Sequence, residues 1–140
     1  MKIDRVFPRK TNATPDDTLV FFGPPPLLLL PEIDEVHISV AFTYDRQKAE
    51  ELAEDWRWVG VPVKLGGPAY DDQATGEFVP GRYIKKGRTI TSRGCNNRCW
   101  FCSAWRREGK LRELEIKDGW EVLDNNLLQL LDQELNMRWF

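Results

Sequence analysis

Residues 35–65 read EVHISVAFTYDRQKAEELAEDWRWVGVPVKL, and this stretch decides the fold. Residues 35–43 alternate between apolar and polar side chains, which is the period-two pattern of a half-buried strand. Apolar residues at helical spacing follow, namely Ala49, Leu52, Ala53 and Trp56. Residues 61–65 are again apolar, and Pro62 favours an edge position for that strand. The stretch therefore predicts a strand, a helix and a second strand.

Signals at the ends of these elements agree with a βαβ unit. Asp45 precedes the helical repeat and is expected to cap its first turn, and Gly60 stands where a helix would stop. Residues 2–7 and 18–22 have strand-like composition. The sequence thus predicts an α/β fold, with a small N-terminal βαβ (Rossmann-like) domain at residues 1–80 and a second part at 81–140.

Charge is divided unevenly along the 140 residues. The formal net charge is −2, yet residues 82–112 hold ten basic side chains and a single acid, Glu108, so this stretch carries +9 and the remainder −11. Residues 1–10 are charged and lack the apolar run of a signal peptide, and the aliphatic run 27–30 is too short to cross a bilayer. With clustered, odd-numbered thiols, these features favour a cytoplasmic protein without membrane contact.

All three cysteines, Cys95, Cys99 and Cys102, lie within eight residues in the spacing CxxxCxxC. Soft thiolate ligands at this density favour zinc, cuprous copper or an iron–sulfur cluster. A structural zinc site takes four protein ligands, and the single histidine, His37, is 58 residues upstream. A [4Fe–4S] cluster held by three thiolates would instead leave one iron open to a small molecule.

The stretch TITSRGCNNRCWFC, residues 89–102, resembles the cluster-binding segment of radical S-adenosylmethionine enzymes. In that family a CxxxCxxC loop, with an aromatic residue just before the third cysteine, follows the first strand of a partial (β/α) barrel. Phe101 stands at the aromatic position. The resemblance implies that the three thiolates bind a [4Fe–4S] cluster and that S-adenosylmethionine binds the fourth iron, to be cleaved into a 5′-deoxyadenosyl radical.

The same resemblance suggests further cofactor contacts. Phe101 would pack near the adenine of S-adenosylmethionine, or else belong to the core. Residues 120–123 are predicted to form the second barrel strand, followed by Asp124 and Asn125 where many family members place a Gly-Gly-Glu segment. Asp124 or Asn125 would then hold the amino group of the cofactor, or alternatively cap a closing helix over residues 127–135. Trp100 is expected to be buried against the sheet.

Length complicates this interpretation. A complete barrel of this type takes about 200 residues or more, and 46 residues run from Cys95 to Phe140. The chain is therefore expected to be a fragment, a truncated product, or a protein that works with a complementing chain that supplies the later strands. The chemistry also implies a low-potential electron donor of the flavodoxin or ferredoxin type.

Two alternatives stay open from the residues alone. One is a non-catalytic module that binds zinc or an iron–sulfur cluster without radical chemistry. In the other, the basic stretch 82–112 contacts nucleic acid or another phosphate-bearing partner, instead of balancing the charge of a cluster or forming a solvated face. Nucleic acid is possible but not favoured, because the sequence shows no base-stacking aromatic pattern.

Overall fold

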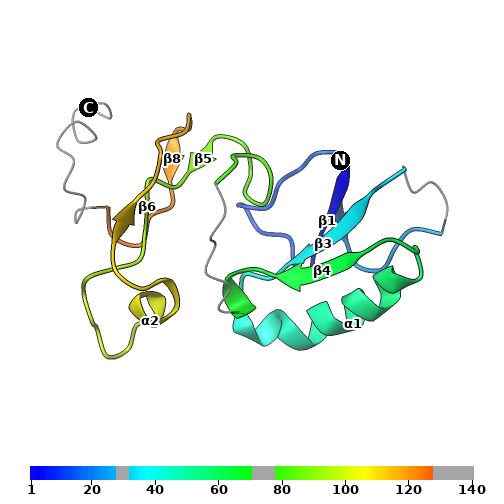
Figure 1. Cartoon of the computed structure of the whole chain (residues 1–140), viewed down its shortest axis with the longest axis horizontal. Coiled ribbons are helices and arrows are strands. Elements are labelled where there is room, and N and C mark those ends of the chain that lie inside the picture. Colours follow the sequence, from blue (N-terminus) through cyan, green and yellow to red (C-terminus); the bar gives the residue numbers. More distant parts are fainter. Residues whose placement is uncertain (28–31, 71–77, 128–140) are drawn as a thin grey trace.

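The computed structural model describes residues 1–27, 32–70 and 78–127, and Figure 1 shows two lobes. The N-terminal lobe is built on a parallel sheet in the order β2-β1-β3-β4. Its strands are β1 (Ile3–Phe7), β2 (Val20–Phe22), β3 (Glu35–Ser39) and β4 (Val63–Gly66). The α/β class and the βαβ unit, with β3 and β4 parallel and joined through a helix, are confirmed.

Helix α1 (Arg46–Arg57) covers one face of this sheet. Residues Val36, Ile38 and Val40 alternate inward as the sequence predicts, and they meet the buried stripe of α1. That stripe consists of the predicted residues Ala49, Leu52, Ala53 and Trp56. Trp56 is fully buried and its indole N–H donates to the Gly23 carbonyl at 2.9 Å. The core of the molecule therefore lies between the sheet and α1.

The start of α1 differs from the prediction. The predicted strand 35–43 ends at Ser39, and a short 3-10 helix, η1 (Thr43–Asp45), leads into α1, leaving Phe42 39% exposed. Asp45 is the residue before α1, but its side chain does not cap the helix. Its two carboxylate oxygens instead accept hydrogen bonds from the Arg9 guanidinium, at 3.0 and 3.1 Å. A charged two-point contact has replaced the expected cap.

The other face of the sheet is covered in part by residues 81–85. Arg5 is buried on β1 and its guanidinium donates to the carbonyls of Gly81 and Arg82, at 2.9 and 2.8 Å. His37 contacts the Tyr83 hydroxyl at 2.5 Å, so it is a hydrogen-bonded residue on this face of the sheet. These bonds attach the beginning of the second lobe directly to the first.

The C-terminal lobe, residues 78–127, contains two separate two-stranded sheets in its described residues. Strand β5 (Arg88–Thr89) pairs in parallel with β8 (Glu121–Val122), and β6 (Ser92–Arg93) pairs antiparallel with β7 (Arg112–Glu113). A helix of five residues, α2 (Ala104–Glu108), lies between β6 and β7 in the sequence. Residues 88–93 are thus divided between two sheets, because β5 pairs with β8 and β6 pairs with β7.

Some predictions fall outside the described residues. The closing helix predicted over residues 127–135 lies almost wholly there, as do Leu28–Leu30 of the aliphatic run. A second 3-10 helix, η2 (Pro68–Tyr70), follows β4 and completes the described elements. None of the helices in the described ranges combines the length and the hydrophobicity needed to traverse a lipid bilayer.

Candidate metal centre

The cysteine loop leaves the sheet just after β6. Gly94 has a φ of +81°, and a Cβ at this position would overlap the Lys110 carbonyl. Only glycine combines this backbone conformation with so close a neighbouring chain. Cys95 N–H then donates to the Gly109 carbonyl at 3.1 Å, which fixes the start of the loop against the segment that follows α2. The chain therefore turns away sharply at Gly94.

The three cysteines are half-buried thiols on this loop and the turn that follows it. Cys102 N–H donates to the Cys99 carbonyl at 3.1 Å, which closes a tight turn between these two residues. The indole N–H of Trp105, from α2, donates to the same carbonyl at 3.1 Å. In the part of the chain that the structure describes, no three cysteine, histidine or carboxylate side chains are gathered closely enough to hold a metal ion.

Asp124 follows β8 and connects it to residues 91–92, just before the cysteine loop. One of its oxygens accepts from the Thr91 N–H at 2.7 Å. The other accepts from the hydroxyls of Thr91 and Ser92, at 2.5 and 2.7 Å. Because Thr91 and Ser92 are buried, this carboxylate satisfies polar groups that water does not reach. Asp124 thus has a structural task, and its contact with a cofactor stays a prediction.

Glu108 is the other carboxylate that shapes the loop. It ends α2 and accepts hydrogen bonds from the Gly94 N–H at 3.0 Å and from the Asn125 side chain at 2.6 Å. Arg93 lies 3.4 Å from it. The predicted residue Asn125 is therefore held beside the loop by Glu108. Sequence reasoning left Glu108 without a role, although its position as the single acid of a +9 stretch was an available signal.

The aromatic residues of the loop are on the surface. Phe101 is 76% exposed and Trp100 85% exposed, and their rings meet edge to face at 5.5 Å. The prediction that Trp100 is buried against the sheet is wrong, and so is a core position for Phe101. The physical reason is that α2 presents no buried residue, so no apolar layer is available beside the loop to cover them.

Basic side chains surround the loop. Arg93 is half-buried beside Glu108, whereas Arg98 lies exposed between Cys95 and Cys99. The Arg106 guanidinium stacks on the Trp105 ring at 5.0 Å. A cluster ligated by three thiolates carries net negative charge, and nearby guanidinium groups would offset it. The charge around the loop is thus of the sign that such a cluster requires.

Comparison of the chain with protein-family models, with curated proteins and with solved structures found no significant match. The site is therefore interpreted from its own residues. Its donor set fits an iron–sulfur cluster: three thiols, not joined in disulfides, on one loop amid arginine side chains. In the described structure the three sulfurs are not close enough to share a metal, so cluster binding would require the loop to bring them together.

Proposed function

We propose that this chain binds a [4Fe–4S] cluster through Cys95, Cys99 and Cys102, and that the open iron of the cluster takes S-adenosylmethionine. The chain would then be a radical S-adenosylmethionine protein. The observation that carries the proposal is the CxxxCxxC spacing, with Phe101 directly before the third cysteine. Three ligands rather than four leave a coordination position for a substrate or cofactor.

The local topology supports this proposal. Strand β5 comes before the cysteine loop and α2, and it pairs in parallel with β8, which comes after them; β6 and β7 form a separate antiparallel pair on either side of the loop and α2. This is the order of elements that the family resemblance leads us to expect at the start of a partial (β/α) barrel. The later strands of such a barrel belong to the proposal only, and so does a complementing chain that would supply them.

Each residue of the site has a definite part in the proposed function. The three thiolates would hold the cluster, and Arg93 and Arg98 would offset its negative charge. Asp124, which follows β8, holds Thr91 and Ser92 at the start of β6, while Glu108 holds the loop at Gly94. When bound, the cluster would supply one electron, delivered by a low-potential donor, to the sulfonium of the cofactor.

Anaerobic reconstitution of the full chain with iron and sulfide tests the proposal. We expect a brown protein whose electron paramagnetic resonance spectrum, after reduction, changes on addition of S-adenosylmethionine. Cys95→Ser, Cys99→Ser and Cys102→Ser should each lose iron and the spectrum. Asn97→Ala is the matched control, because Asn97 is an exposed loop residue between two of the ligands.

Three results would contradict the proposal in whole or in part. A colourless preparation in which all three thiols alkylate readily would exclude a cluster on this loop. Stoichiometric, tight zinc without any cluster would instead favour the alternative of a non-catalytic metal-binding module. A cluster that forms but is insensitive to S-adenosylmethionine would restrict the function to a non-catalytic iron–sulfur module.

A further inference from the structure

A hollow of about 400 Å³ lies where the two lobes meet, away from the cysteines. The loop after β1 forms one wall, with Lys10, Thr11 and Asn12. The other wall is formed by the amino ends of β5 and β8, with Lys86 and Trp120. This volume falls in the range of roughly 300–1,000 Å³ that is usual for small-molecule sites.

Two contacts of Lys85 fix the two walls to each other. The Lys85 N–H donates to the Ala13 carbonyl at 2.7 Å, and the Lys85 ammonium pairs with Asp16 at 2.8 Å. This hydrogen bond from Lys85 lowers the pKa of Asp16. Within the second wall, Arg88 on β5 pairs with Glu121 on β8 at 2.7 Å. The hollow is therefore a preformed feature rather than a gap between loosely placed parts.

Trp120 presents a flat aromatic surface to this hollow. The backbone N–H of Trp120 donates to the Gly87 carbonyl at 2.8 Å, and the residue is nevertheless 79% exposed. A Cβ on Gly87, whose φ is +94°, would overlap the indole, so the ring lies directly on the backbone of Gly87. An indole that is held in this way and open to solvent can stack on a planar ring.

The charge of the lining favours an anion. Four cations, Lys10, Lys85, Lys86 and Arg88, face two carboxylates, Asp16 and Glu121. Both carboxylates are already bound to Lys85 and Arg88. Lys10 lies 5.8 Å from the Phe22 ring, and neither Lys10 nor Lys86 pairs with a carboxylate among the described residues. Two ammonium groups are thus available to a phosphate.

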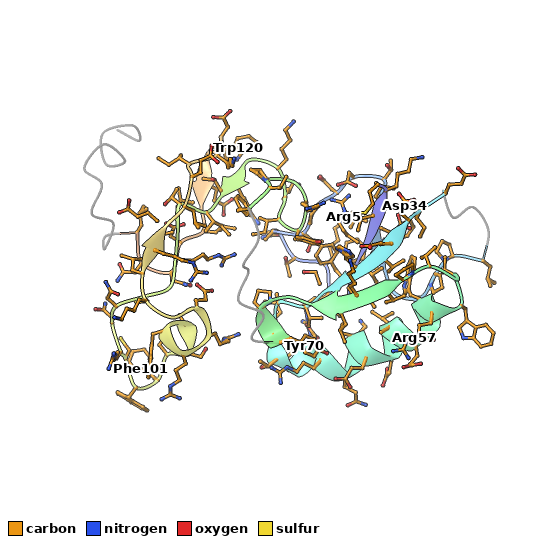
Figure 2. All side chains as sticks on the ribbon, viewed as in Figure 1. Arg5, Asp34, Arg57, Tyr70, Phe101 and Trp120 are labelled. Atoms are coloured by element: carbon orange, nitrogen blue, oxygen red, sulfur yellow. The ribbon has the colours of Figure 1, made fainter. Side chains whose placement is uncertain are left out.

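We propose that this hollow is a binding site for a nucleotide, with the base stacked on Trp120 and the phosphate held by Lys10 and Lys86. The same chemistry is offered by a free mononucleotide and by one nucleotide of a single-stranded nucleic acid. S-adenosylmethionine carries a positive sulfonium and no phosphate, so it does not suit the site. Figure 2 shows Trp120 far from Phe101 of the cysteine loop, at the opposite end of the lobe.

Calorimetric titration of the full chain with AMP and UMP tests the site, beside adenosine and inorganic phosphate separately and a single-stranded ten-nucleotide oligonucleotide. We expect a nucleotide to bind more tightly than either of its halves. Trp120→Ala should weaken binding by about fivefold or more, which is the value of one base stacked on an aromatic ring. Lys86→Glu should weaken nucleotide binding more than Trp120→Ala does, and it should reduce the salt dependence of that binding.

Matched controls separate the site from general effects. Trp58→Ala removes a tryptophan that is 91% exposed on the other lobe, and Lys48→Glu makes the same charge change on the exposed face of α1. Neither should alter binding. The Cys→Ser variants should also bind as the unaltered chain does, so a failure of the cluster proposal leaves this test intact. Circular dichroism checks that each variant is folded.

The outcomes are distinct. Binding of mononucleotides that Trp120→Ala and Lys86→Glu weaken supports a site for free nucleotides. Binding of the oligonucleotide alone, with the same sensitivity to both variants, supports the site with nucleic acid as the source. No binding of either, or binding that survives both substitutions, overturns the proposal.

Discussion

The two lobes are held together in different ways. In the N-terminal lobe, α1 buries four residues against a four-stranded parallel sheet. In the C-terminal lobe, α2 buries none, the strands are two residues long, and the carboxylates of Asp124 and Glu108 make many of the connections. The first lobe is thus a packed scaffold, whereas the second is a polar assembly whose order depends on a few side chains.

This difference has a consequence for function. A loop that is held by hydrogen bonds rather than by packing can rearrange at modest cost, and the proposed cluster would require the thiols of such a loop to come together. Metal binding that orders its own ligands contributes directly to the stability of the region around them. The C-terminal lobe, in which packing contributes less, is therefore the one that a cluster would stabilise most.

The largest expected effect is in the packed lobe. Trp56→Ala would remove a fully buried indole that meets the Phe21 ring at 5.4 Å and bonds to Gly23. We expect it to lower the free energy of unfolding by about 3–5 kcal/mol. Urea denaturation followed by circular dichroism measures this. Trp58→Ala, two residues along but exposed, should change it by less than about 0.5 kcal/mol; equal losses would show that α1 is not packed as described.

The next effect should be confined to the C-terminal lobe. Asp124→Ala would remove three hydrogen bonds and leave buried polar groups of Thr91 and Ser92 unsatisfied. We expect a cost of about 2–3 kcal/mol. Hydrogen exchange should then accelerate at residues 88–93 and remain unchanged in β1 and β3. Asp118→Ala, at an exposed position of the same lobe, is the control; faster exchange throughout both lobes would contradict the comparison.

The fold of the packed N-terminal lobe can be predicted from the sequence to a greater extent than that of the C-terminal lobe. The βαβ unit is predictable because burial against one layer imposes period two on β3 and helical spacing on α1. Strands of two residues carry no such period, and those of the C-terminal lobe are stabilised by contacts from far along the chain, as between Thr91 and Asp124. Hydrophobicity alone misplaced Trp100, which lies where no apolar layer exists to cover it.

The candidate site also has some features that the sequence shows and others that only the structure shows. The cysteine spacing is legible in the sequence, as is the need for Gly94 at the start of the loop. The role of Glu108 is not, because it depends on Gly94 and Asn125 reaching the same carboxylate from either side. The contact of Trp120 with Gly87 is equally invisible, since it joins residues 33 positions apart.

A smaller effect is expected from a buried charge in the packed lobe. Asp4 on β1 is fully buried, and neither of its carboxylate oxygens has a hydrogen-bond partner among the residues that the structure describes. Burial raises the pKa of Asp4 to about 6, although the nearby Arg5 charge acts to lower it. Because the folded state holds this proton more tightly than the unfolded chain, stability from Asp4 is complete below about pH 4. It is lost as pH rises through about 6.

Asp4→Asn should remove this contribution. The difference in unfolding free energy between the unaltered chain and the variant should shift by about 1–2 kcal/mol between pH 4 and pH 7, in favour of the variant at the higher pH. Urea denaturation at a series of pH values measures it. Asp55→Asn, on the exposed face of α1, is the control. A difference that stays constant over this range would mean that Asp4 is hydrated or paired in solution.

The smallest expected effect comes from the cysteine loop. Trp100→Ala removes an indole that is 85% exposed and that touches the equally superficial Phe101 ring. Without a buried surface to lose, the unfolding free energy of the metal-free chain should change by less than about 0.5 kcal/mol. Trp56→Ala is expected to lower the unfolding free energy many times more, because Trp56 is fully buried and Trp100 is exposed.

The same substitution becomes informative once the chain is reconstituted with iron and sulfide. If the loop closes around a cluster, Trp100 and Phe101 move with Cys99 and Cys102, and their rings would then shield the metal from water. Trp100→Ala should therefore leave the metal-free protein unchanged and accelerate loss of the cluster in air, followed by the decay of its visible absorbance. Asn97→Ala should not. A stability loss above about 1 kcal/mol in the metal-free variant would show instead that Trp100 is already packed in solution.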